Sequence, residues 1–70
     1  MKYVGVKQVL KAVKEGEVSK VYIGADAENH ITTDLIQACN ENQIEIIEVE
    51  TMAELGKMAG IDIGASAAAE

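Results

Sequence analysis

Apolar residues recur with helical spacing in three stretches of this chain. The spacing i, i+3, i+4 and i+7 begins at Val6 and predicts an amphipathic helix over Val6–Gly16, with the glycine as its C-cap. A second helix is predicted over Asn29–Asn42, with Asn29 as a candidate cap. The capping-box pattern Thr51-Met52-Ala53-Glu54 predicts a third, shorter helix that ends at Gly60.

The same spacing predicts which side chains of the later helices face the core. In the second helix the apolar side contains Ile31 and Leu35, whereas Thr32 is expected to face elsewhere. In the third helix we expect Met52 and Leu55 to point inward, together with Met58 or Ala59.

Short apolar runs between these helices predict strands. They cover Met1–Val4, Lys20–Ala25 and Ile44–Val49, and the segment Ala65–Ala69 predicts either a strand of small residues or a frayed tail. Strands that alternate with helices in this way predict a layered α/β fold. The length of 70 residues predicts one domain, residues 1–70.

Composition narrows the class of protein. Hydrophobic residues make up 49% of the chain and include no Phe or Trp, so we expect a folded domain with an aliphatic core. No apolar run approaches the ~20 residues of a membrane span, and no signal-peptide pattern opens the chain. A single cysteine cannot form an internal disulfide, and a cytoplasmic location is the default.

Candidate catalytic chemistry is sparse. The only histidine, His30, has no partner for a metal site or a nucleophile triad, and Cys39 lies on the apolar side of its predicted helix. We therefore predict a protein that is not an enzyme and needs no cofactor.

Charge is divided unevenly along the chain. The formal net charge is −6, but residues 1–20 have a balance of +3 and residues 21–70 a balance of −9. The segregated lysines suit a local phosphate-facing patch, although a solvated helix face on an acidic protein is the alternative. The absence of arginine removes the best bidentate ligand for phosphate and guanine.

Two segments carry candidate binding chemistry. Gly5 has no side chain with which to cap the first helix, and an open helix start favours anions such as phosphate. Lys7, Gln8 and Lys11 follow at that end, and the Gln8 amide could read a base edge. An ordinary amphipathic helix with a lysine stripe for solubility is the alternative.

The second segment is the loop after the third helix. Ile61 and Ile63 flank Asp62 between two glycines, and apolar side chains on such a loop can pack against an unstacked base. The alternative is that the isoleucines enter the core, which we expect for one of them.

Together these segments resemble the L7Ae/L30e family of small RNA-binding proteins, in particular its short bacterial members. The first motif is Gly5-Val6-Lys7-Gln8-Val9-Leu10-Lys11, similar to the bacterial form of the family pattern. The second and more specific motif is Leu55-Gly56-Lys57-Met58-Ala59-Gly60-Ile61-Asp62-Ile63-Gly64-Ala65. The match extends over nearly the whole chain.

The resemblance implies binding to kink-turn RNA. It implies that Lys7, Gln8 and Lys11 contact sheared G·A pairs and nearby phosphates, and that the loop of Ile61, Asp62 and Ile63 covers a protruding nucleotide. The predicted RNA-binding residues are Gly5, Lys7, Gln8, Lys11, Lys14, Ile61, Asp62 and Ile63.

The resemblance also implies a three-layer α/β/α sandwich with a mixed four-stranded sheet in the order 1-4-2-3. Members of the family usually have a helix before the first strand and larger apolar residues in the last strand. This chain opens at the strand and finishes Ala67-Ala68-Ala69-Glu70, which predicts a thinner core and a trimmed or engineered chain.

These observations leave two functions open. The first is a non-catalytic, ribosome-associated module that recognises kink-turn or similar bulged RNA. The second is a protein-interaction or scaffold module whose RNA surface is weakened or lost, favoured by the acidic balance and the absence of arginine. We expect a monomer, with a homodimer across the bare sheet face as the alternative.

Overall fold

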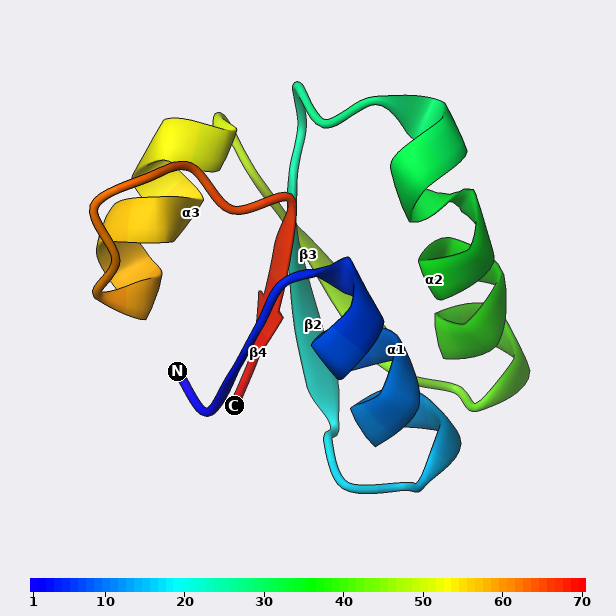
Figure 1. The fold of residues 1–70 in the computed structure, drawn as a ribbon. Coiled ribbons are helices and arrows are strands. Elements are labelled where there is room, and N and C mark those ends of the chain that lie inside the picture. Colours follow the sequence, from blue (N-terminus) through cyan, green and yellow to red (C-terminus); the bar gives the residue numbers. More distant parts are fainter.

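Strands and helices alternate along the whole chain in the computed structural model, which describes residues 1–70 (Figure 1). The elements are β1 (Tyr3–Val4), α1 (Val6–Lys14), β2 (Lys20–Gly24), α2 (Asn29–Glu41), β3 (Glu45–Val49), α3 (Met52–Ala59) and β4 (Ala67–Ala69). None of the three helices has the length and apolarity needed to cross a membrane.

The strands form one mixed sheet in the order β1-β4-β2-β3, as the resemblance implied. β4 is antiparallel to β1 and to β2, whereas β2 and β3 are parallel. The C-terminal segment is therefore a central strand and not a frayed tail. Its residues Ala67, Ala68 and Ala69 are all fully buried.

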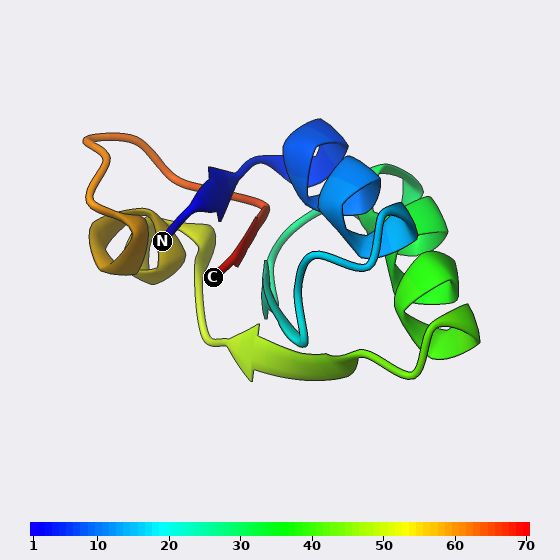
Figure 2. The same ribbon diagram turned by 90° about the horizontal axis from the view of Figure 1, so that it is seen from below.

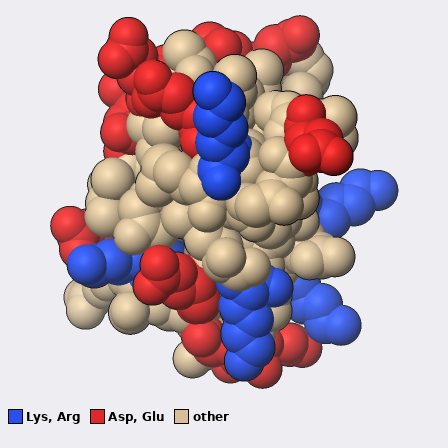
Figure 3. Space-filling model, turned by 90° about the vertical axis from the view of Figure 1, so that its left-hand side faces the viewer, with Lys and Arg blue, Asp and Glu red and all other residues tan.

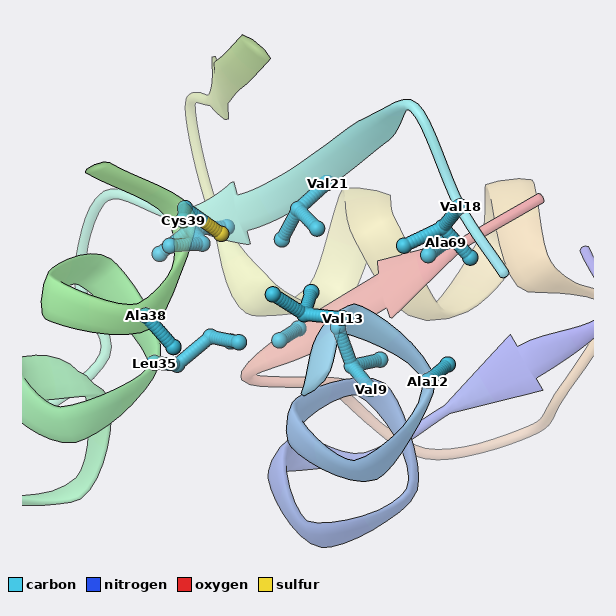
Figure 4. Close-up of a cluster of buried hydrophobic side chains, with 11 residues drawn as sticks. Val9, Ala12, Val13, Val18, Val21, Leu35, Ala38, Cys39 and Ala69 are labelled. Carbon is cyan, nitrogen blue, oxygen red and sulfur yellow. The ribbon is translucent and has the colours of Figure 1, made fainter. Parts of the chain in front are cut away.

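The sheet separates helices on its two faces, which confirms the three-layer α/β/α sandwich. α1 and α2 cover one face and α3 covers the other (Figure 2). On the first face, Val9 and Val13 of α1 pack with Leu35 of α2 and Val21 of β2 (Figure 4). On the second face, buried Leu55 of α3 packs with a smaller group of residues, namely Val49, Ala65 and Ala68.

Two inward-facing positions differ from the pattern-based prediction. Thr32 is only 3% exposed, whereas Ile31 is 41% exposed. Thr32 lies three residues before Leu35 on the buried side of α2, and its hydroxyl donates to the Glu28 carbonyl 3.5 Å away. A threonine can occupy a buried helix position because this local bond satisfies the hydroxyl. In α3 the prediction left Met58 or Ala59 open, and Ala59 is the half-buried residue of the two, whereas Met58 is 50% exposed.

Several element boundaries also differ from the prediction by one or two residues. α1 ends at Lys14, and its C-cap is Glu15 and not Gly16. Asn29 is the first residue of α2 and not its cap, because the capping position belongs to Glu28, whose side chain makes no capping hydrogen bond. β2 ends at Gly24, so Ala25 lies outside the strand, although its N–H still donates to the Val49 carbonyl at 2.7 Å.

Candidate nucleic-acid interface

The start of α1 is open to solvent. Gly5 has a φ of 99°, in a region that L side chains rarely adopt, and a Cβ built there would meet no atom within 4 Å. Gly5 makes no side-chain cap, and the first turn of α1 contains no acidic residue. No side chain therefore caps the amides of that turn, the arrangement that favours an anion at a helix start.

Exposed lysines flank this open start. Lys7, Gln8, Lys11 and Lys14 are all exposed on α1. The one salt-bridge contact of the structure joins His30 Nδ1 to Glu28 Oε2 at 3.2 Å, so no carboxylate lies within that distance of these lysines. Their ammonium groups are therefore free for phosphates.

Two shallow hollows border the lysines. Lys11 and Gln8 line one of about 370 Å³ together with Lys2 and Tyr3, and Lys11 also lines a second of about 370 Å³ with Lys7 and Lys14. Lys14 additionally borders the groove between α1 and α2, where Asp34 and Glu41 line the opposite side. Glu15 also lines both hollows and Glu17 lines the first, so each of these lysines has a carboxylate nearby, and Lys14 has the two carboxylates of α2 in addition.

In the loop after α3, Ile63 is exposed to solvent and Ile61 is partly buried. Ile61 is half-buried against the Leu55 side of the core, as expected for one of the pair. Asp62 is exposed, and Ile63 is 74% exposed, more than any other large apolar residue. Gly60 ends α3 in a left-handed conformation.

Sheet topology brings the helix start and the loop to the same end of the molecule. β1, β2 and β3 run in one direction and β4 runs against them. The residues after β1 and those before β4 must therefore meet at one end of the sheet (Figure 1). The Gly5 N–H donates to the Ala67 carbonyl at 2.8 Å, which joins the two segments directly.

The predicted site residues do not form one continuous cluster. The positions on α1 lie on one side of the sheet, while Ile61, Asp62 and Ile63 extend from the α3 side. A ligand that touches both groups must cross the end of the sheet.

Negative charge surrounds the loop. Asp26 and Glu50 follow β2 and β3 at the same end of the sheet, and Glu54 and Asp62 belong to α3 and its loop. Figure 3 shows the face that carries α3, where acidic atoms lie along both the upper and the lower edge and single lysines stand among them. The face is predominantly uncharged at its centre. The loop itself contains no basic residue, and the lysines of α1 lie on the other side of the sheet.

Two residues near the site were missed by the sequence analysis. Lys2 and Tyr3 line the hollow beside Gln8, and the Lys2 Nζ lies 5.7 Å from the Tyr3 ring centroid. The Tyr3 hydroxyl donates to Glu17 Oε1 at 3.1 Å. Desolvation, and then this hydrogen bond, raise the pKa of Tyr3, so the phenol remains a neutral donor. The only feature of the sequence that could have indicated Lys2 and Tyr3 as site residues is their closeness to Gly5 in the chain.

No group of three or more His, Cys, Asp or Glu side chains is arranged to hold a metal ion. The available chemistry is cationic and amide side chains beside an open helix start, with an exposed isoleucine across the sheet end.

Comparison with known proteins identifies the family. The sequence model of the ribosomal protein L7Ae/L30e/S12e/Gadd45 family matches residues 3–70. An RNA-binding protein of Caldanaerobacter subterraneus is 51% identical over 67 residues, which cover 96% of this chain and 82% of that protein. RNA-binding protein YbxF of Geobacillus stearothermophilus is 38% identical over 66 residues, covering 94% of this chain and 80% of the relative.

A solved structure agrees with these sequence matches. The 15.5kD RNA binding protein of Giardia lamblia superposes with a TM-score of 0.87 at 25% identity, covering 94% of this chain and 56% of that protein. These relatives are named for RNA binding and not for catalysis. This chain therefore belongs to the ribosomal protein L7Ae/L30e/S12e/Gadd45 family.

Proposed function

We propose that this protein is a non-catalytic RNA-binding module that recognises kink-turn or similar bulged RNA. The observation that carries the proposal is the open start of α1 at Gly5, flanked by lysines without ion-pair partners. RNA-binding names among the relatives support it.

Each site residue has a distinct role in this proposal. Lys7 and Lys11 bind phosphates and guanine acceptors around sheared G·A pairs, and Gln8 donates and accepts hydrogen bonds at a base edge. Lys14 adds a weaker phosphate contact because acidic residues of α2 lie nearby. On the loop, the half-buried Ile61 supports the backbone beside Asp62, and Ile63 covers a protruding nucleotide.

The family description supports a ribosomal setting, and we extend the proposal to ribosomal or similarly folded cellular RNA in the cytoplasm. The surrounding acidic surface limits how far RNA can spread beyond α1, since phosphates are repelled there.

Titration against a kink-turn RNA and a matched duplex without the bulge, each at two salt concentrations, tests the proposal. The parent protein should prefer the kink-turn and bind more weakly at high salt. Lys11→Ala should weaken that binding by about 1–3 kcal/mol while thermal unfolding stays unchanged. Lys20→Ala is the matched control, because Lys20 is exposed at the opposite end of β2.

Equal losses for Lys11→Ala and Lys20→Ala would indicate unspecific charge effects and refute the residue assignment. A folded parent protein without preference for the kink-turn would refute RNA recognition. The leading explanation would then be a protein-interaction or scaffold function, which the net charge of −6 favours.

A further inference from the structure

We propose that Asp26 and Met52 are positioning residues that hold the loop of residues 60–66 so that Ile63 meets the protruding nucleotide. This inference rests on the proposed function and concerns the specificity of that same site. Neither residue is among the predicted RNA-binding residues.

Asp26 ties the start of α3 to the end of β2. Its Oδ1 accepts a hydrogen bond of 2.7 Å from the Met52 N–H, across a separation of 26 residues. Thr51 caps a different amide of the same turn, since its hydroxyl accepts from the Glu54 N–H at 3.0 Å. The first turn of α3 is thus fixed both by its own cap and by a carboxylate from another element.

Met52 in turn makes hydrogen bonds to the loop. Its carbonyl accepts from the Ala65 N–H at 3.0 Å, and its sulfur accepts from the Ser66 hydroxyl at 3.5 Å. A Cβ at Gly64 would lie 3.3 Å from the Met52 Cβ, and one at Gly24 would lie 2.7 Å from the Met52 Cγ. Met52 therefore fills the space between the end of β2 and the loop, and it leaves little room for a side chain at Gly24 or Gly64.

The other end of the loop is held by Gly56. The Gly56 carbonyl accepts from the Ile61 N–H at 3.0 Å, and a Cβ at Gly56 would overlap the Ile63 carbonyl oxygen. The loop is consequently fixed on both sides of Ile63, while the Ile63 side chain is 74% exposed. A rigid loop that presents an apolar side chain to solvent is preorganised for a ligand.

The negative charge of Asp26 and its hydrogen bond to Met52 predict opposite effects on RNA affinity when Asp26 is replaced. As a carboxylate near the proposed RNA, Asp26 should oppose binding, so its loss should strengthen binding. As the hydrogen-bond partner of Met52, it should support binding through the loop. Asp26→Asn and Asp26→Ala remove the same charge, but only asparagine retains an oxygen that can accept from Met52.

The test compares these two variants on two RNAs. One is a kink-turn with its protruding nucleotide, and the other is the same RNA with that nucleotide abasic, which keeps the backbone. We expect Asp26→Ala to bind the complete kink-turn roughly five- to tenfold more weakly than Asp26→Asn, as for loss of a helix-capping hydrogen bond. On the abasic RNA the two variants should bind equally.

Amide hydrogen exchange of the free protein gives a readout without RNA. The Ala65 and Met52 amides should exchange faster in Asp26→Ala than in Asp26→Asn, while amides of α1 and α2 remain unchanged. Equal exchange and equal kink-turn affinity in both variants would overturn the inference and leave the proposed function intact. If the parent protein binds a kink-turn and a duplex equally well, the proposed function is refuted, and the positioning role of Asp26 and Met52 is refuted with it.

Discussion

Ile61 and Ile63 occupy neighbouring places in the same short loop and have different environments. Ile61 is half-buried against the core, whereas Ile63 is the most exposed large apolar residue of the chain. The same residue type therefore supports the fold at one position and is available to a ligand at the other. An isolated exposed isoleucine is ordinary on its own, but here it stands on a fixed loop beside an open helix start.

Cys39 shows how a single buried residue links stability to pH. It is fully buried between α2 and the sheet, and burial raises the pKa of its thiol. Above the ordinary thiol pKa of about 8.5 the unfolded chain loses this proton while the folded chain keeps it. The free energy of unfolding should therefore decrease as pH rises, by about 1.4 kcal/mol per pH unit at most.

Denaturant unfolding between pH 7 and pH 9.5 measures this decrease, and Cys39→Ala is the comparison. The variant should be less stable throughout, because it leaves a small cavity, but its stability should change less over that pH range. Parallel pH dependences of the two proteins would show that Cys39 is not the titrating group.

Helix α3 and the loop that follows it behave as one element, because Gly56 leaves no space between them. Gly56 is buried in the helix, and any Cβ there would overlap the Ile63 carbonyl. Glycine inside a helix normally costs about 1 kcal/mol relative to alanine. Close packing of the loop outweighs this cost.

Gly56→Ala should therefore destabilise the protein by about 1–3 kcal/mol, opposite to the usual effect of alanine in a helix. Thermal or denaturant unfolding measures the change. Ala53→Gly in the exposed part of α3 is the matched control and should cost about 1 kcal/mol through helix propensity alone. Increased stability in Gly56→Ala would mean that the loop can move away from α3.

At the scale of the whole molecule, apolar exposure is dispersed. The exposed large apolar residues are Ile31 and Ile36 on α2, Met58 on α3 and Ile63 on the loop. On the α3 side of the sheet, Val4 and Tyr22 are half-buried against the core. A homodimer across the sheet face would have little continuous apolar surface to bury, and the net charge of −6 on each copy would oppose it.

We expect a monomer without RNA. Sedimentation velocity over a hundredfold range of protein concentration, at low and at high salt, should give one species near 7.5 kDa. A dimer that appears only at high salt would indicate that charge repulsion conceals an association surface. Ile63→Ser and Ile31→Ser would then locate that surface on the loop or on α2.

Local patterns were enough to predict most of the fold. The helical spacing after Val6, the capping box at Thr51 and the glycine at position 60 each specify a helix or its end through contacts within a few residues. The sheet order came from resemblance to the family, because strand pairing depends on contacts between distant residues, and so did the kink-turn roles of the candidate site residues. Thr32 was wrongly predicted to face away from the core. Its buried hydroxyl donates a hydrogen bond to the Glu28 carbonyl, which the sequence pattern does not reveal.

The sequence by itself determined where helices and strands form, that the core is aliphatic, and that lysines gather on the first helix. Only the tertiary structure decided which isoleucine of the loop is exposed, that the C-terminal alanines form a strand and not a frayed tail, and that Asp26 reaches Met52. These features depend on segments far apart in the chain, and their geometry follows from how the layers pack and not from any local pattern.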